Sequence, residues 1–301
     1  MSRKARICTI SMNSLVHGNR SSKEDRFREA EAKMKQGALD APDLFLLPET
    51  FLCNDVPGAF ADPANIEEEG NEAYERLGAA ARAYGAYVAA PLLTRLDGVP
   101  RNSTVIFDRG GSPVYAYHKT YLTGGEAAAG LVPGERRQEA FDADFGRLGI
   151  AICYDLNFQP LLRHYYDQGV EVLLFTTYFP GGMLLRSWAY LYSFHAVSSH
   201  AQGHESMFVN PLGYVVARAN MFAQALTHEF QLDCVLAPYY GNRNAVQAAK
   251  EKYGPELELD IHRAEGDVIL YYHGTQTTAR DIVREFEIRT RADYYRGEHL
   301  L

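Results

Sequence analysis

The stretch Gly149–Pro160, GIAICYDLNFQP, places a cysteine at the point where a buried strand ends. Its first residues are small or apolar, as in a strand buried on both faces, and the residues after Cys153 turn polar and reach a proline. A cysteine that only fills space in the core would lie within the apolar run. We therefore predict that Cys153 begins a turn at the end of a strand, where its side chain is placed to react.

Two more apolar runs end in a residue that can do chemistry. Glu49 follows the run DLFLLP, and Lys119 lies just beyond the strand predicted in VYAY. Because sites in α/β folds gather beyond the carboxyl ends of strands, we expect Glu49, Lys119 and Cys153 to lie close together. A carboxylate can take the proton of a thiol, and an ammonium group can stabilise an oxyanion. The backbone N–H of Tyr154 is expected to be the second oxyanion donor.

The segments LLPET, YHKTYL and GIAICYD resemble the three signature motifs of the nitrilase superfamily, the carbon–nitrogen hydrolases, in order and in spacing. The resemblance covers roughly residues 5 to 237. It implies an α/β fold built as a four-layer α-β-β-α sandwich, without a metal or an organic cofactor. It also implies that Glu49 is the general base, Lys119 the stabiliser of the oxyanion and Cys153 the nucleophile.

The same resemblance implies a second glutamate between the lysine and a Pro-Gly pair. The segment LTGGEAAAGLVPG offers Glu126 before Pro133-Gly134. Because the register of this loop varies within the family, Glu135 is the alternative. We assign Glu126 to the catalytic set.

The turn after the nucleophile departs from the family pattern, and it borders the pocket. Asn157 stands where arginine is common, and Gln159-Pro160 inverts the usual proline-then-acid pair. The pair Tyr154-Asp155 resembles the amidase-like branches, whereas true nitrilases tend to show Trp-Glu there. Loops at strand ends carry much of the binding in such folds, so Asn157, Tyr178 and Phe179 are the candidate substrate-binding residues.

These motifs predict hydrolysis of a non-peptide carbon–nitrogen bond, in an amide or an N-carbamoyl group, through a cysteine thioester. Three alternatives stay open. The chain could be a nitrilase with the same triad, an N-acyltransferase that passes the acyl group to an amine, or a catalytically inactive binding module. The intact triad argues against the last. The sequence does not name the substrate.

The composition of the 301 residues limits the partners and the setting. Hydrophobic residues make up 47% of the chain, which is typical of a folded globular protein. The net charge of −8 argues against nucleic acid or an anionic membrane as the main partner. We find no signal-peptide pattern and no apolar run of membrane-spanning length. The four cysteines are far apart, which indicates a reducing, cytoplasmic setting without a disulfide framework or a zinc site.

Strands that alternate with helices predict one α/β domain over residues 1–238. Within it, the segments Ile66–Tyr84 and Leu184–Ala201 are each expected to form a helix. Residues 239–301 are charged, rich in tyrosine and weakly periodic, which indicates a C-terminal extension that packs on the core or on a neighbouring subunit. Tyrosine and arginine favour interfaces, and members of the family commonly dimerise by packing helices. We therefore expect a homo-oligomer, at least a dimer, acting on a small molecule.

Overall fold

The structure is a computed structural model that describes residues 3–12, 22–53, 58–202 and 205–298, with side chains described up to residue 294. Contacts along the chain divide it into two compact units. The larger unit comprises residues 6–228, and the smaller unit comprises residues 1–5 together with residues 229–301.

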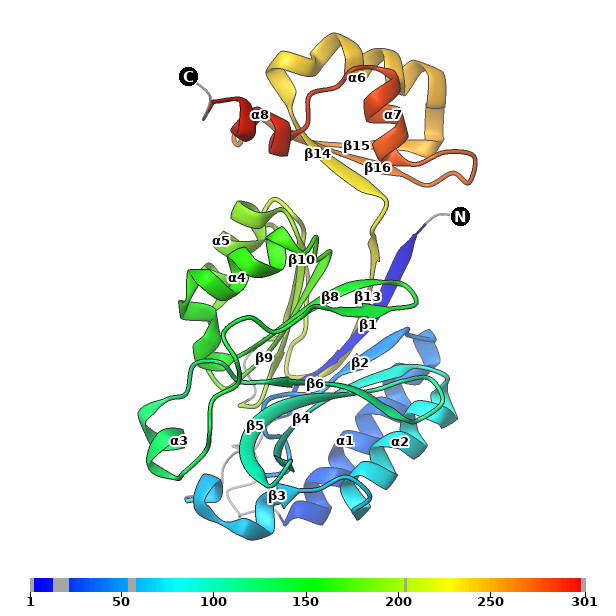
Figure 1. The fold of residues 1–301 in the computed structure, drawn as a ribbon. Helices are drawn as coiled ribbons and strands as arrows, with labels where there is room; N and C mark the ends of the chain where they lie inside the picture. Colours follow the sequence, from blue (N-terminus) through cyan, green and yellow to red (C-terminus); the bar gives the residue numbers. More distant parts are fainter. Residues whose placement is uncertain (1–2, 13–21, 54–57, 203–204, 299–301) are drawn as a thin grey trace. The chain divides into compact units, whose positions relative to one another are not determined.

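The larger unit is built on two β-sheets (Figure 1). The first sheet has the order β13 (Ala225–Gln231), β1 (Lys4–Ile10), β2 (Leu44–Leu46), β4 (Tyr87–Leu96), β5 (Val99–Phe107) and β6 (Pro113–His118), with the short β3 (Ile66–Glu67) beside β4. The second sheet has the order β12 (Val215–Arg218), β11 (Met207–Val209), β10 (His195–His200), β9 (Val172–Thr177), β8 (Gly146–Ile152) and β7 (Phe141–Ala143).

Helices cover the outer face of each sheet, and the two sheets face each other (Figure 1). The first sheet carries α1 (Lys23–Gly37) and α2 (Glu72–Tyr84), and the second carries α4 (Gln159–Asp167) and α5 (Gly182–Tyr192). Buried hydrogen bonds join the sheets: the Thr9 hydroxyl donates to the carbonyl of Ser198 at 2.6 Å, and the Ser199 hydroxyl donates to the carbonyl of Ile10 at 2.6 Å. The predicted four-layer α-β-β-α sandwich is confirmed.

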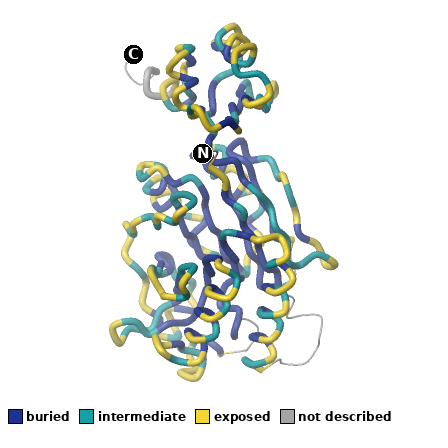
Figure 2. The backbone as a smooth tube through the Cα atoms, turned by 90° about the vertical axis from the view of Figure 1, so that its right-hand side faces the viewer, coloured by how far each residue is buried: buried dark blue, intermediate teal, exposed yellow. Residues whose placement is uncertain are grey.

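The strands form the buried centre of this unit, and the outer faces of the helices are exposed (Figure 2). Strands β2 and β9 are buried along their whole length, which explains why each reads as an unbroken apolar run. Helix α1 turns Phe27, Ala30 and Met34 toward the first sheet. Among the described residues, no helix is both long enough and apolar enough to cross a membrane.

The helix predicted over residues 184–201 is wrong in its second half. Helix α5 ends at Tyr192, Ser193 adopts a left-handed φ of 56°, and His195–His200 form β10. Strand β10 lies parallel to β9 inside the second sheet. A short, fully buried strand has no alternating pattern, so periodicity alone does not separate it from a buried helix.

The helix predicted over residues 66–84 begins later than expected. Ile66–Glu67 form β3 beside β4, and α2 begins at Glu72. The helix begins there because the Asn71 side chain accepts a hydrogen bond from the Tyr74 backbone N–H at 3.2 Å. Asn71, a favourable N-cap residue, indicates this start in the sequence, but the prediction followed the alanine-rich pattern instead.

The smaller unit has a sheet and a core of its own. Its strands have the order β14 (Cys234–Pro238), β16 (Asp267–Tyr272) and β15 (Leu257–His262), and its helices are α6 (Tyr239–Tyr253), α7 (Ala279–Glu285) and α8 (Arg291–Glu298). Helices α6 and α7 pack Val246 and Ile282 against Leu270 of the sheet. The weak periodicity of this segment did not reveal these elements. The domain boundary at residue 238 and the packing of the extension stay predictions.

Candidate active site

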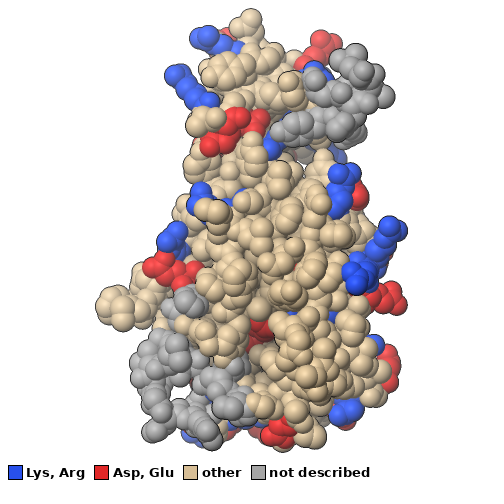
Figure 3. All heavy atoms as spheres, turned by 90° about the vertical axis from the view of Figure 1, so that its left-hand side faces the viewer, with Lys and Arg blue, Asp and Glu red and all other residues tan. Residues whose placement is uncertain are grey.

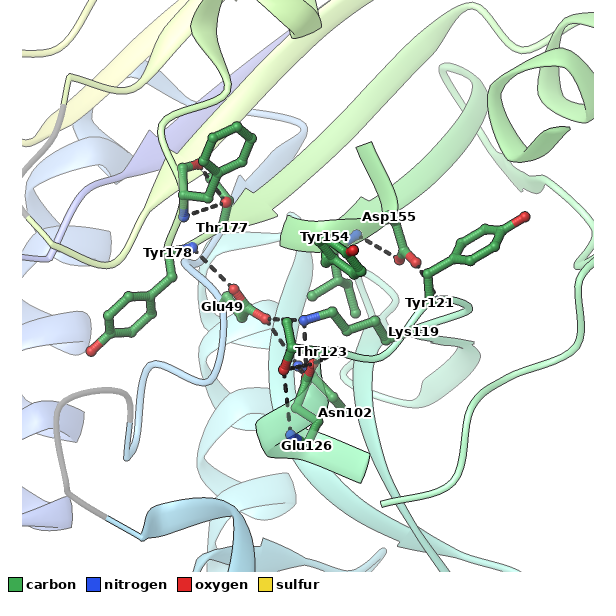
Figure 4. A network of polar contacts seen from close by, with 12 residues as sticks. Glu49, Asn102, Lys119, Tyr121, Thr123, Glu126, Tyr154, Asp155, Thr177 and Tyr178 are labelled. Atoms are coloured by element: carbon green, nitrogen blue, oxygen red, sulfur yellow. Dashed lines mark hydrogen bonds and ion pairs between the residues drawn. The ribbon is translucent and has the colours of Figure 1, made fainter. Parts of the chain in front are cut away.

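Four strand ends carry the candidate site (Figure 4). Strand β2 ends shortly before Glu49, β6 ends immediately before Lys119, β8 ends immediately before Cys153, and β9 ends before Tyr178. Because β8 and β9 are parallel neighbours, their carboxyl ends lie at one edge of the second sheet. The structure brings together the three residues that the sequence motifs singled out.

Lys119 lies between two carboxylates in a site closed to solvent. Its Nζ donates to Glu49 Oε1 at 2.8 Å and to Glu126 Oε1 at 2.9 Å. All three side chains are at most 3% exposed. Burial alone lowers the pKa of Lys119, but Glu49 and Glu126 outweigh it and raise that pKa above its ordinary value. The lysine is therefore a permanent cation.

Glu126 is fixed by the short helix α3 (Gly124–Ala128). Thr123 caps this helix, and its backbone N–H and its hydroxyl each donate to Glu126 Oε2 at 2.8 Å. This capping box holds one oxygen and turns the other toward Lys119. Burial raises the pKa of Glu126, but Lys119, Asn102 and Thr123 together lower it below its usual range. Glu135, the alternative, is exposed on the loop.

The carboxylate of Glu49 is held on both oxygens. Oε1 accepts from Lys119 and from the Asn102 side-chain amide at 3.0 Å. Oε2 accepts from the backbone N–H of Tyr178 at 3.0 Å, at the end of β9. A base that is held in this way keeps its direction toward the neighbouring strand ends.

Cys153 occupies a sharp turn directly after β8. Its φ of 48° lies in the left-handed region, which costs a non-glycine residue of order 1 kcal/mol or more. Burial and the charge of Glu49 raise the pKa of the thiol to about 11, although Lys119, the Phe179 N–H and the Thr177 hydroxyl act in the opposite direction. The thiol is therefore protonated at neutral pH, and the reaction needs a base beside it.

Asp155 secures the turn from inside the protein. Its Oδ2 accepts from the Ile152 N–H at 3.0 Å and from the Tyr117 hydroxyl at 2.8 Å. Its Oδ1 accepts from the Tyr121 N–H at 2.7 Å. The carboxyl group thus joins the turn that carries Cys153 to the loop that follows Lys119. Complete burial raises its pKa to about 7 against these donors and Lys119.

The candidate substrate-binding residues differ in their placement. Tyr178 and Phe179 follow β9 at the site, and the Phe179 side chain is 41% exposed. The Phe179 N–H donates to the Thr177 hydroxyl at 2.8 Å, which fixes this loop. Asn157 is exposed and donates from Nδ2 to the Tyr154 carbonyl at 3.0 Å, so its amide group stabilises the turn. Their contact with a substrate stays a prediction.

The sequence analysis gave no role in this site to two of its buried polar residues, Asn102 and Asp155. A signal for Asn102 was available. Strands β5 and β6 form a hairpin whose register pairs Ser103 with His118, and Lys119 donates its backbone N–H to the Asn102 carbonyl at 2.8 Å. The glycine turn Gly110-Gly111 between these strands was the signal that places Asn102 beside Lys119.

The arrangement offers a thiol, a carboxylate base and a fixed cation in one largely buried site, and these are the groups that acyl transfer requires. The first N–H groups of a helical turn have no partner within it, and Tyr154 lies in the first part of the turn Cys153–Asn157, so its N–H stays the predicted second donor to the oxyanion. In the part of the chain that the structure describes, no group of three or more His, Cys, Asp or Glu side chains is arranged to hold a metal ion.

Comparisons with known proteins also indicate a carbon–nitrogen hydrolase. A sequence model of the family named "Carbon-nitrogen hydrolase" matches residues 6–237. The chain is 25% identical to "Hydrolase C26A3.11" of Schizosaccharomyces pombe over 66% of this chain and 69% of that protein. It is 26% identical to "Omega-amidase NIT2" of Homo sapiens over 66% of this chain and 80% of that protein. The crystal structure of Saccharomyces cerevisiae Nit3, from branch 10 of the nitrilase superfamily, superposes with a TM-score of 0.66 at 20% identity over 77% of this chain and 91% of that chain.

Proposed function

Because the chain belongs to the carbon–nitrogen hydrolase family of the nitrilase superfamily, we propose that it hydrolyses an amide or N-carbamoyl group with Cys153 as the nucleophile. The observation that carries this proposal is the buried contact of Lys119 with Glu49 and Glu126 beside the thiol. Membership of the family establishes cleavage of a carbon–nitrogen bond. The residue roles and the substrate class are our proposal.

In the first half of the reaction, the thiol attacks the substrate carbonyl carbon. Glu49 takes the thiol proton as the new carbon–sulfur bond forms. The carbonyl oxygen becomes an oxyanion, and the Lys119 ammonium group and the Tyr154 N–H donate to it. The oxyanion then reforms the carbonyl while the carbon–nitrogen bond breaks. Glu49 returns the proton to the leaving nitrogen, which departs as ammonia or an amine.

In the second half, water hydrolyses the thioester. Glu49 takes a proton from the water as its oxygen attacks the acyl carbon. The same two donors stabilise the second oxyanion. The carbon–sulfur bond breaks, the carboxylic acid leaves, and the proton returns to the sulfur of Cys153. With a pKa of about 11 the thiol is regenerated in its neutral form, ready for the next cycle.

Two observations favour amides over nitriles as substrates. The residues after the nucleophile are Tyr154-Asp155, the pair typical of amidase-like branches, and the human relative is an omega-amidase. Ammonia release from matched panels of primary amides, N-carbamoyl amino acids and nitriles tests the proposal. Turnover of the first or second panel supports it. Turnover confined to nitriles contradicts it, and acyl transfer to hydroxylamine without hydrolysis indicates an acyltransferase.

Replacing Glu126 by glutamine should lower kcat by about 10- to 100-fold. A hydrogen bond to a charged group contributes about 1.5–3 kcal/mol, and each 1.36 kcal/mol in the barrier is tenfold in rate. The change keeps the size of the side chain but removes the charge that holds Lys119 on its second side. Steady-state kinetics on the preferred amide measures the effect.

Glu135→Gln is the matched control for this change. Glu135 is exposed and lies on the same loop, so we expect its kcat to stay within about twofold of wild type. Equal losses in the two variants, or a loss only in Glu135→Gln, would exclude Glu126 from the site.

We also propose that the protein forms a homo-oligomer. Its face over α4 and α5 is largely uncharged in Figure 3, with charged side chains mainly near its edges. On this face Met183 is 81% exposed and Leu191 is 54% exposed, both on α5. Exposed apolar side chains of this size are typical of an interaction surface. One charged residue of α5, Arg186, is also exposed between them in the sequence. Part of residues 239–301 is expected to contribute as well.

Light scattering should therefore give the full chain a mass of at least twice 33.7 kDa. The double variant Met183→Glu/Leu191→Glu should shift the protein toward the monomer, because like charges are introduced into one interface. Leu39→Glu, at a residue that is 87% exposed outside this face, is the control and should change nothing. A monomeric wild-type protein rejects the oligomer, and an unchanged mass of the double variant moves the interface away from α5.

The setting and partners follow from composition and remain part of the proposal. All four cysteines are free in the structure, which suits a reducing cytoplasm. The net charge of −8 suits a small-molecule substrate better than nucleic acid or an anionic membrane.

A further inference from the structure

One cation serves two carboxylates in the candidate site. An ammonium group has three hydrogen-bond donors, and Lys119 directs two of them to Glu49 Oε1 and Glu126 Oε1. Only the third is left for an oxyanion. Two buried carboxylates so close together repel each other, and a single positive charge leaves the group with a net negative charge. Thr123 and Tyr178 donate only to the Oε2 atoms of Glu126 and Glu49, so the two Oε1 atoms that face Lys119 need a further donor.

Asn102 repeats both contacts of the lysine without adding charge (Figure 4). Its Nδ2 donates to Glu49 Oε1 at 3.0 Å and to Glu126 Oε1 at 2.7 Å. The side chain is fully buried. The orientation of the amide is fixed, because its oxygen cannot face two carboxylate oxygens that accept hydrogen bonds.

The other end of this amide makes no compensating contact. Asn102 Oδ1 is buried and has no hydrogen-bond partner among the described residues. A buried acceptor without a partner costs about 1–3 kcal/mol, so packing alone does not account for an asparagine here. A residue chosen only to fill this space would be apolar. The two hydrogen bonds from Nδ2 to Glu49 and Glu126 therefore explain why an asparagine occupies this position.

The backbone of Asn102 completes the arrangement. Its carbonyl accepts the Lys119 N–H at 2.8 Å, and its strand β5 pairs with both β4 and β6. The same residue thus holds the lysine through the main chain and the two glutamates through the side chain. This coupling fixes the distance between the three groups.

We propose that Asn102 is a positioning residue that supplies neutral donors to Glu49 and Glu126, so that Lys119 keeps its third hydrogen for the oxyanion. The inference rests on the proposed function for its catalytic meaning. Without these donors Glu126 holds its charge less well, and both carboxylates draw the lysine hydrogens more strongly. Both changes reduce kcat, because Glu126 must keep the charge that holds Lys119 and the third ammonium hydrogen must be free for the oxyanion.

Asn102→Leu tests this proposal, because leucine has a similar volume and no donor. We expect kcat to fall about 100-fold and KM to change by less than about threefold, since the contacts act on the transition state. The ratio of variant to wild-type kcat/KM should fall further as the pH is lowered, because Asn102 helps to lower the pKa of Glu126 and its loss makes Glu126 easier to protonate. Thr104→Val is the control: Thr104 is fully buried, lies two residues further along β5 and has a hydroxyl without a partner among the described residues.

Asn102→Asp gives the opposite dependence on pH. The introduced carboxyl repels its two neighbours when ionised and supplies one donor when protonated, so its activity relative to wild type should rise as the pH falls. Opposite trends in the two variants support the proposal. Ratios to wild type that do not depend on pH in either variant would show that Asn102 has only a structural role and would overturn it.

Stability separates this inference from the proposed function, because it does not depend on turnover. The folded-state pKa of Glu126 is lowered, with Asn102 among the causes, so this stabilisation is present at neutral pH and is lost as the pH falls through the folded pKa. The difference in unfolding free energy between wild type and Asn102→Leu should narrow from pH 7 to pH 3.5, while the difference for Thr104→Val stays constant. A constant difference for both variants overturns the inference even if the enzyme is active. A narrowing difference supports it even if no amide is turned over.

Discussion

Replacement of Cys153 by alanine is expected to lower amide turnover by at least about 10⁴-fold, the scale on which loss of a catalytic nucleophile acts. The alanine side chain has no atom that can form the carbon–sulfur bond, and no other thiol is placed beside Lys119 and Glu49. Cys8 and Cys53 are buried, and burial raises their pKa values to about 11 and about 12. Steady-state kinetics with a sensitive ammonia assay measures the loss.

The variant should remain folded, which makes the loss of activity interpretable. Cysteine and alanine both carry a Cβ atom, so the strain at the left-handed φ of residue 153 is unchanged. The contacts that secure the turn come from Asp155 and not from the thiol. Circular dichroism and the unfolding free energy should match those of wild type to within about 1 kcal/mol. Activity close to wild type in Cys153→Ala, with the other cysteines intact, excludes Cys153 as the nucleophile.

Replacement of Lys119 by alanine should lower kcat by at least about 100-fold, the effect of losing one oxyanion donor. It should also reduce the unfolding free energy by about 3–5 kcal/mol, because Glu49 and Glu126 remain buried without their cation. Lys119→Gln keeps a neutral donor group and should be the more stable of the two variants, with kcat still strongly reduced. Chemical denaturation and steady-state kinetics on both variants separate the two effects.

The charge of Lys119 also acts on the thiol. Lys119 lowers the pKa of Cys153, although burial and Glu49 together hold it at about 11. Removing a neighbouring positive charge raises the pKa of a thiol by about one unit or more. At each pH below that pKa, less of Cys153 is then present as the thiolate. Alkylation of Cys153 by iodoacetamide between pH 7 and pH 10 should be about tenfold slower in Lys119→Ala. Equal alkylation rates would mean that Lys119 does not act on the thiolate.

The parts of the fold that the sequence predicted are those with a local signal. Strand β2 and the second part of β8, Leu148–Ile152, are apolar runs that are followed by polar residues. The hairpin of β5 and β6 has a glycine turn at Gly110-Gly111. Strand β10 was missed, because its buried residues have no alternation and follow a helix with only Ser193 and Phe194 between them. The strand is defined by its pairing with β9 on one side and β11 on the other.

The residues of the candidate site also differ in whether a local sequence signal predicts them. Glu49, Lys119 and Cys153 each follow a recognisable strand, so their position in the sequence carries the information. Asn102 acts through side-chain contacts with Glu49 and Glu126, which are 53 and 24 residues away along the chain. Contacts over such distances depend on how the sheets pack, and a single sequence does not encode them in any local pattern.

Mass spectrometry of the enzyme during turnover tests the central claim most directly. The protein is mixed with an amide that it hydrolyses, quenched in acid within the steady state and digested to peptides. The account predicts the mass of the acyl group on the peptide that contains Cys153, its disappearance once the substrate is exhausted, and no such adduct in Cys153→Ala. An acyl group on a different residue, or steady-state turnover by the Cys153→Ala variant at the wild-type rate, would contradict the account.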